Sequence, residues 1–211
     1  MRIETRFFVL PIHPGFNLTD KGNVAFSPSR AYKYRNSKVQ VFKQVQGIGM
    51  SKHEQLLREL EGYARSATGV EALMAHIAQR LHEEMARYNW VGFYLADESL
   101  PGTLVLGPYE GSFLPLQRVS FDVGLCGHAA TTRRTVVVND INGNLHYVSA
   151  ADLVKSEMVV PVLVGNALVG EIDVESYFVG TFSKQDQEFV EACTALVGRF
   201  MEKRARGTVD K

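Results

Sequence analysis

The hydrophobic positions after residue 50 first follow a helical period. Apolar side chains recur at three- and four-residue steps between Ser51 and Ala67, and again between Thr68 and Asn89. Such spacing puts the apolar residues on one face of a helix. Each segment starts with Ser or Thr followed three residues later by Glu, which is the spacing of a capping box. The pattern therefore predicts two amphipathic helices.

From Trp90 onward the period changes to two, which indicates strands. The predicted strands are Trp90–Glu98, Thr103–Gly111, Leu116–Phe121, Thr135–Asp140 and a hairpin, Ser156–Ser176, that turns at Gly165 and Asn166. A short helix follows Gly124, and Ser183 and Asp186 open a long C-terminal helix. This order predicts an α+β fold, an α/β/α sandwich with a central, mainly antiparallel sheet flanked by helices.

Residues 1–49 carry no such periodicity and have a net charge of +6, although the whole chain has a net charge of zero. We expect this basic segment to be mostly unstructured, followed by one domain over residues 50–205 and a tail over residues 206–211. The segment has three possible origins: a basic arm for an acidic partner, a targeting peptide, or a translated upstream region. The capping box directly after Met50 favours the last, with Met50 as the natural initiator.

The composition of the chain argues against several classes of protein. Apolar residues make up 45% of the chain, enough for a core, and the 23 basic and 23 acidic residues balance, which argues against a nucleic-acid partner. Two cysteines form neither a disulfide framework nor a zinc quartet. No apolar run reaches the roughly 20 residues of a membrane span, and no secretory signal is evident. We therefore expect a cytoplasmic protein without a membrane partner.

Trp90, Gly92 and Tyr94 share one face of the first predicted strand, because successive side chains alternate. Val91 and Phe93 take the other face, which suits a helix-covered core. A glycine between two aromatic residues leaves a shallow slot in which a ligand could lie. The alternative is that both aromatic side chains simply fill the core.

Glu157, Asp173 and Glu175 lie on the two strands of the last predicted hairpin. Asp173 and Glu175 are two residues apart and so share a face. Crowded carboxyl groups raise the pKa of at least one member, which suits a general acid or a site for a cationic ligand. Alternatively, these acids mark the solvent face of a half-exposed strand, with Ile172 and Val174 pointing inward.

Cys126 lies between two glycines at the predicted start of a helix, where the helix dipole favours a thiolate. It is therefore a candidate nucleophile, or else a small buried residue in a tight turn. Cys193 falls on the apolar stripe of the last helix and is predicted to be core. His128 and His146 are candidate acid–base groups or surface residues, and no Cys/His spacing predicts a metal site.

Five motifs in fixed order resemble the free methionine-(R)-sulfoxide reductases, which are single GAF-domain enzymes. The motifs are NWVGFYL, LVLGPYEG, GLCGHA, SEMVVP and GEIDVES. The resemblance covers Ser51 to Phe200. It implies a GAF fold, a homodimer formed through the terminal helices, and no cofactor.

The resemblance also implies a reaction and its residues. In that family a cysteine thiolate attacks the sulfur of free methionine sulfoxide, a second cysteine forms a disulfide, and thioredoxin regenerates the enzyme. Carried over by motif, Trp90 and Tyr94 would contact the small-molecule substrate. Glu157, Asp173 and Glu175 would bind its ammonium group and sulfoxide oxygen; Glu175 replaces the second Asp of a D-x-D motif. Cys126 matches the cysteine of the family's G-x-C-G motif.

The chain departs from the family in its cysteines. The attacking cysteine of the family precedes the SEMVVP strand, whereas residues 141–155 contain none, and Ser149 or Ala150 takes its place. A second family cysteine is also missing, since residues 113–118 contain none. A serine hydroxyl does not replace a thiolate that must later form a disulfide.

Two functions follow from these observations. One is a GAF protein that binds methionine or its sulfoxide without reducing it. The other is single-cysteine reduction through Cys126, with an external thiol such as glutathione. A regulatory GAF module for another ligand, such as a cyclic nucleotide, is disfavoured because three acids would repel phosphate and Arg118 is the only nearby cation.

Overall fold

The computed structural model describes residues 49–142 and 153–209. It contains the predicted alternation of helices and strands. The helices are α2 (Lys52–Ala64), α3 (Val70–Glu84), α4 (Gly124–Thr132) and α5 (Lys184–Val209). The strands are β1 (Trp90–Ala96), β2 (Thr103–Gly111), β3 (Arg118–Ser120), β4 (Val136–Val138), β5 (Ser156–Val164) and β6 (Ala167–Ser176). No helix in these two ranges is long and apolar enough to cross a membrane.

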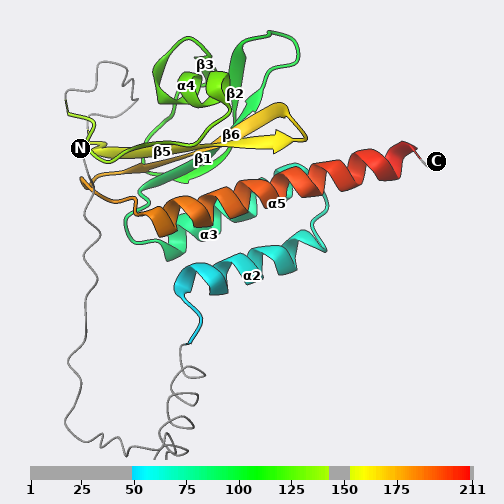
Figure 1. The fold of residues 1–211 in the computed structure, drawn as a ribbon, viewed down its shortest axis with the longest axis horizontal. Coiled ribbons are helices and arrows are strands. Elements are labelled where there is room, and N and C mark those ends of the chain that lie inside the picture. The colour runs from blue at the N-terminus through cyan, green and yellow to red at the C-terminus, as the bar shows by residue number, and fades with distance from the viewer. Residues whose placement is uncertain (1–48, 143–152, 210–211) are drawn as a thin grey trace, which may run out of the picture. The chain divides into compact units, whose positions relative to one another are not determined.

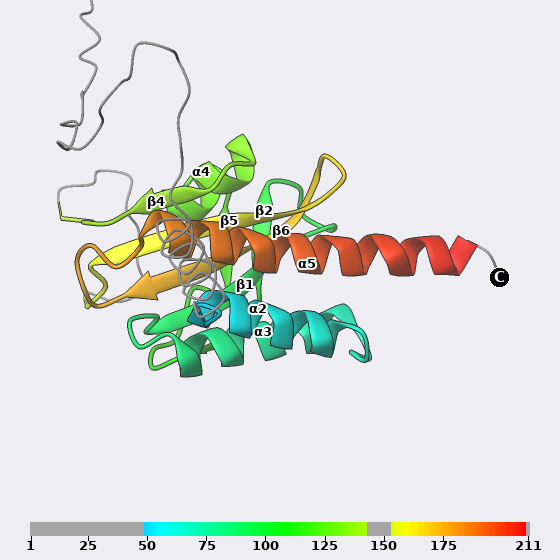
Figure 2. The ribbon, with the colours of Figure 1, turned by 60° about the horizontal axis from the view of Figure 1, so that its bottom comes forward.

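The strands form one sheet in the order β3-β2-β1-β6-β5-β4, and every neighbouring pair is antiparallel. Helices α2, α3 and α5 lie on one face of this sheet and α4 lies on the other, as Figures 1 and 2 show. The α+β sandwich expected from the sequence is therefore confirmed. In the two central strands, β1 and β6, alternate side chains point toward the three long helices and toward α4.

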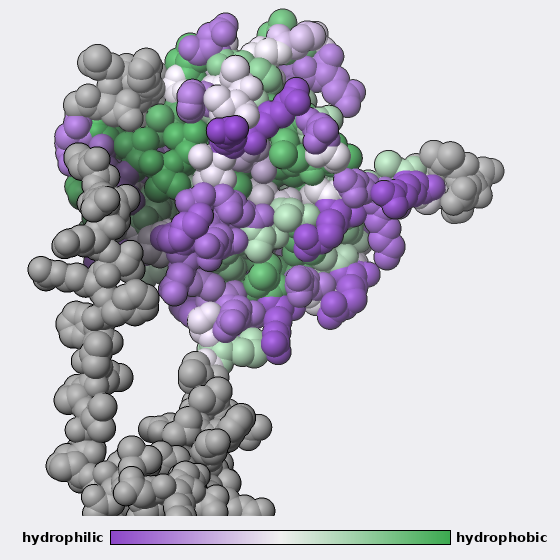
Figure 3. All heavy atoms as spheres, in the orientation of Figure 1, coloured by the Kyte–Doolittle hydropathy of each residue, from purple (hydrophilic) through white to green (hydrophobic). Residues whose placement is uncertain are grey.

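The main hydrophobic core lies between the sheet and helices α2, α3 and α5. Val91 and Phe93 of β1 and Ile172 and Val174 of β6 are fully buried there, as their alternation predicts. Cys193 of α5 is also fully buried in this core, which confirms its predicted structural role. The outer surfaces of α2 and α5 are largely hydrophilic in the view of Figure 3, as expected for amphipathic helices.

The N-terminal caps follow the sequence prediction in two cases of three. Ser51 caps α2, with reciprocal bonds between Ser51 and Glu54, and Ser183 and Asp186 form the same arrangement before α5. The box predicted at Thr68 is wrong, since α3 begins at Val70 with Gly69 as its N-cap and no side-chain cap bond. Thr68 thus lies one residue too early for the reciprocal geometry.

Two helix ends also differ from the prediction. Helix α3 ends at Glu84 rather than near Asn89, and α5 continues to Val209, beyond the predicted domain end at residue 205. The hairpin of β5 and β6 turns at Gly165, whose φ of +58° favours glycine.

Candidate functional site

The antiparallel register brings the predicted site residues onto one face of the central sheet. Trp90 lies opposite Glu175 and Gly92 lies opposite Asp173 between β1 and β6. Glu157 of β5 in turn lies opposite Glu175. Since each strand alternates, these residues all point to the side of the sheet that α4 covers.

The three acids of this face are buried. Glu157, Asp173 and Glu175 are only 3%, 4% and 6% exposed. The alternative of a solvent-exposed acidic face is therefore wrong, because α4 and the segment after β2 cover it. In each residue one carboxylate oxygen is buried without a hydrogen-bond partner among the described residues: Glu157 Oε2, Asp173 Oδ1 and Glu175 Oε2. Unpartnered buried carboxylates are costly in a folded chain and usually have a functional explanation.

A cavity of about 240 Å³ opens onto these acids. Glu157, Asp173, Glu175 and Cys126 supply its polar side, and Phe113, Leu116, Val119 and Leu125 are among the apolar side chains that complete it. Arg118 is the only Lys, Arg or His among its lining residues, and its guanidinium pairs with Asp97. The cavity thus combines an apolar wall with a buried group of acids that the described part of the chain leaves without a cation.

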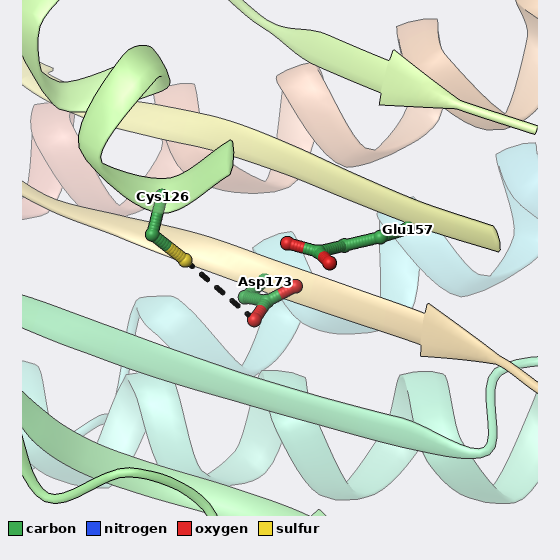
Figure 4. A group of neighbouring side chains, drawn as sticks. All are labelled: Cys126, Glu157 and Asp173. Carbon is green, nitrogen blue, oxygen red and sulfur yellow. Dashed lines mark hydrogen bonds between the residues drawn. The ribbon is translucent and has the colours of Figure 1, made fainter. Parts of the chain in front are cut away.

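Cys126 reaches this group from α4, where it is the third residue of the helix. Its Sγ lies 3.7 Å from Asp173 Oδ2 and donates a weak hydrogen bond to it. Figure 4 shows the thiol and the carboxyl groups of Asp173 and Glu157 pointing toward one another. One ligand atom from each of the three residues lies within 4.8 Å of the other two. The predicted catalytic cysteine and the predicted acids are therefore brought together.

The acids resist ionisation in this setting. Burial raises the pKa of Glu175 to about 9, and the Asp173 charge adds to the shift. Burial likewise raises the pKa of Asp173 and of Glu157 well above the usual range, with neighbouring carboxylates contributing in both cases. The expectation that crowding raises the pKa of at least one acid is met, with burial as the larger cause.

The thiol of Cys126 differs from the sequence expectation. Burial raises the pKa of this thiol well above its ordinary value, and the charges of Glu171, Asp173 and Glu157 raise it further. The helix dipole favours a thiolate, but the dipole is outweighed by desolvation and by several nearby negative charges. Cys126 is therefore held as a thiol, which corrects the prediction of an activated thiolate at the helix start.

Trp90 and Tyr94, the two aromatic residues predicted to contact the ligand, have different positions. Tyr94 lines the cavity, and its hydroxyl donates a 2.9 Å hydrogen bond to Leu116 O. Trp90 is 1% exposed and is not among the lining residues. Its indole lies over Gly92, where an added Cβ would be 2.1 Å from a ring atom. The slot expected over Gly92 is thus filled by Trp90 itself, which stacks on Phe113 of the cavity wall.

Glu171 is a buried acid beside Cys126 that the sequence reasoning missed. It is fully buried opposite Tyr94, and burial raises its pKa to about 8, with the Cys126 thiol partly offsetting the shift. The signal was present, since Glu171 precedes Asp173 by two residues and so shares its face. His128 is exposed and lies outside the cavity lining, while His146, Ser149 and Ala150 fall outside the described residues.

Comparisons with known proteins agree with the observed fold. A sequence model of the GAF domain matches residues 67–202. The free methionine-R-sulfoxide reductase of Saccharomyces cerevisiae is 31% identical over 154 residues, which cover 69% of this chain and 83% of that protein. The Escherichia coli protein of the same name is 29% identical, with 63% and 78% covered. The Neisseria meningitidis reductase, solved with its substrate, aligns with a TM-score of 0.69 at 28% identity, covering 74% of this chain and 95% of its own.

Proposed function

Since this chain belongs to the GAF-domain family, we propose that its cavity binds free methionine or methionine sulfoxide. The observation that carries the proposal is the group of buried acids with unpartnered oxygens beside an apolar wall. An ammonium group supplies both the positive charge and the N–H donors that these carboxylates lack. A cavity of about 240 Å³ suits a ligand of amino-acid size. The relatives named as free methionine-R-sulfoxide reductases support this choice of ligand.

The contacts of the proposed ligand follow from the lining. The ammonium group and the sulfoxide oxygen would meet Glu157, Asp173 and Glu175, with a protonated carboxyl donating to the oxygen. The apolar part would lie against Tyr94 and Phe113. Trp90 would respond through Phe113, because their rings stack with centroids 5.8 Å apart.

A second candidate function is single-cysteine reduction of the sulfoxide, favoured by the position of Cys126 in the cavity lining. The Cys126 sulfur would attack the sulfoxide sulfur, leaving methionine and a cysteine sulfenic acid that holds the oxygen and the thiol proton. One external thiol would then form a mixed disulfide and release water. A second external thiol, from glutathione or thioredoxin, would restore Cys126 and leave as a disulfide. We rank binding ahead of turnover because the thiol is buried and protonated and the chain has only one other cysteine.

Binding is tested by titrating methionine and its (R)-sulfoxide while following the fluorescence of Trp90, the only tryptophan. We expect a saturable change that is lost in Asp173→Asn and kept in Glu110→Gln, which removes an exposed acid of β2. A flat titration, with no rise in melting temperature for either ligand, would contradict the proposal. Stabilisation by a cyclic nucleotide instead would favour a regulatory GAF module.

Reduction is tested by turnover of free methionine-(R)-sulfoxide with excess dithiothreitol. Turnover that disappears in Cys126→Ser and persists in Cys193→Ser would establish the single-cysteine route. No turnover in the unmodified protein, together with saturable binding, would establish a binding protein.

A further inference from the structure

Three potential metal ligands converge in the cavity from different elements. Cys126 comes from α4, Glu157 from β5 and Asp173 from β6, and all three are buried. One donor atom of each lies within 4.8 Å of the other two, and Figure 4 shows the three groups facing a common point. No short sequence spacing predicts this group, because tertiary packing alone brings the three residues together.

The spacing of two of the donors is close to that in a tetrahedral metal centre. Zinc bonds to sulfur and oxygen are about 2.0–2.3 Å long, so two ligands of one tetrahedral ion lie about 3.5 Å apart. The distance from Cys126 Sγ to Asp173 Oδ2 is 3.7 Å. These two donors are therefore already spaced as ligands of one ion, and a Glu157 oxygen, which lies within 4.8 Å of both residues' donor atoms, would complete the set by moving toward them.

Each acid of this group also has one oxygen without a partner among the described residues. Glu157 Oε2 and Asp173 Oδ1 are buried without a hydrogen-bond donor among the described residues. The one cationic side chain in the cavity lining, Arg118, is paired with Asp97. A bound cation would satisfy the carboxylate oxygens that the described residues leave unpartnered.

We propose that Cys126, Glu157 and Asp173 form a binding site for a thiophilic divalent cation, represented by Zn²⁺. The thiol selects zinc over magnesium or calcium, which prefer oxygen ligands alone. Metal binding would displace the thiol proton, so that sulfur binds as thiolate. The three protein ligands leave a fourth position open toward the cavity, which also gives the ion its path from solvent.

This site does not depend on the proposed binding of methionine. An ammonium group and a metal ion would need the same carboxylates, so we expect Zn²⁺ and methionine to compete. Metal binding without methionine binding, or the reverse, separates the two proposals.

The test uses Co²⁺ as a spectroscopic substitute for zinc, added to metal-free protein reduced with a phosphine. We expect one equivalent to produce a thiolate-to-cobalt charge-transfer band that Zn²⁺ removes. The band should vanish in Cys126→Ser and persist in Cys193→Ser. An absent band would overturn the proposal. A band unchanged in Cys126→Ser would also overturn it, since the other cysteine would then supply the thiolate.

The acidic ligands are tested by competition between the protein and a chromophoric zinc chelator. Removing a residue that only hydrogen-bonds to a metal ligand weakens metal binding by about 10–100-fold. Glu157→Gln and Asp173→Asn remove proposed ligands themselves and should weaken binding at least that much. Glu110→Gln should leave it unchanged. These variants retain the thiol and replace an acid with an amide of the same shape, so they decide the question even if Cys126→Ser fails to fold. Unchanged affinity in both would overturn the site.

Discussion

Burial changes the protonation and the contribution to stability of three acidic residues, Glu157, Asp173 and Glu175. On an exposed strand these side chains would contribute little to stability, whereas here they are buried under α4 with unpartnered oxygens. Their pKa values rise because the charged form loses its hydration. The folded state therefore retains protons that the unfolded chain releases. Such acids lower the stability of the folded state at neutral pH.

This difference in proton binding predicts a pH dependence. The pKa of Glu175 is about 9 in the folded state against 4.5 for an ordinary Glu, so the folded state holds more protons between these values. The free energy of unfolding should be highest below about pH 4.5 as far as this group is concerned, and fall as pH rises through about 9. Glu175→Gln should flatten the fall and stabilise the protein by about 1–3 kcal/mol at alkaline pH.

Urea unfolding at a series of pH values, with Glu110→Gln as the exposed control, checks this expectation. A fall of the same slope in Glu175→Gln would show that Glu175 is not the group responsible.

At the scale of elements, α4 decides whether the cavity exists. Its close approach to the end of β3 depends on Gly127, where an added Cβ would lie 2.6 Å from Phe121 O and 2.7 Å from Ser120 O. These are backbone atoms, which move only with their strand. Gly127 therefore has a packing role that Gly62 of α2 does not have, because a Cβ on Gly62 meets only the flexible end of Arg65 at 3.6 Å.

This contrast predicts opposite effects for two equivalent substitutions. Gly127→Ala should destabilise the protein by about 1–3 kcal/mol, because the added methyl group forces α4 away from the sheet. Gly62→Ala should stabilise it by up to about 1 kcal/mol, since alanine has the higher helix propensity. Thermal or urea unfolding of both variants measures the effect. Equal effects would contradict the close-approach argument.

At the scale of the whole molecule, the described residues from Met50 onward form a compact unit with a hydrophobic core of its own. The cap of α2 is likewise made by Ser51 and Glu54. This unit therefore has the core and the helix cap that independent folding requires. The roles proposed for residues 1–49 and the homodimer implied by the family resemblance stay predictions.

A chain starting at Met50 is therefore expected to melt within about 1–2 °C of the full chain. In a domain of this size a stability difference of 1 kcal/mol shifts the melting temperature by about 2–4 °C, so the expected difference in stability is below about 1 kcal/mol. Ligand titrations of both chains should also coincide. A clearly lower melting temperature for the shorter chain would show that residues 1–49 contribute to the fold.

The sequence by itself determined the kinds and order of the elements and the facing of their side chains. Local periodicity along the chain is enough to predict the alternation around Phe93 and Asp173 and the apolar stripe that contains Cys193. It also marked Cys126 and the three acids as candidates.

Tertiary structure alone decided what these candidates experience. The docking of α4 buried the acids, added Glu171 to the group and turned the expected Cys126 thiolate into a thiol. The same packing placed Trp90 over Gly92 instead of leaving a slot. Burial, pKa and the distances between Cys126, Glu157 and Asp173 depend on residues far apart in the chain, and no local pattern encodes them.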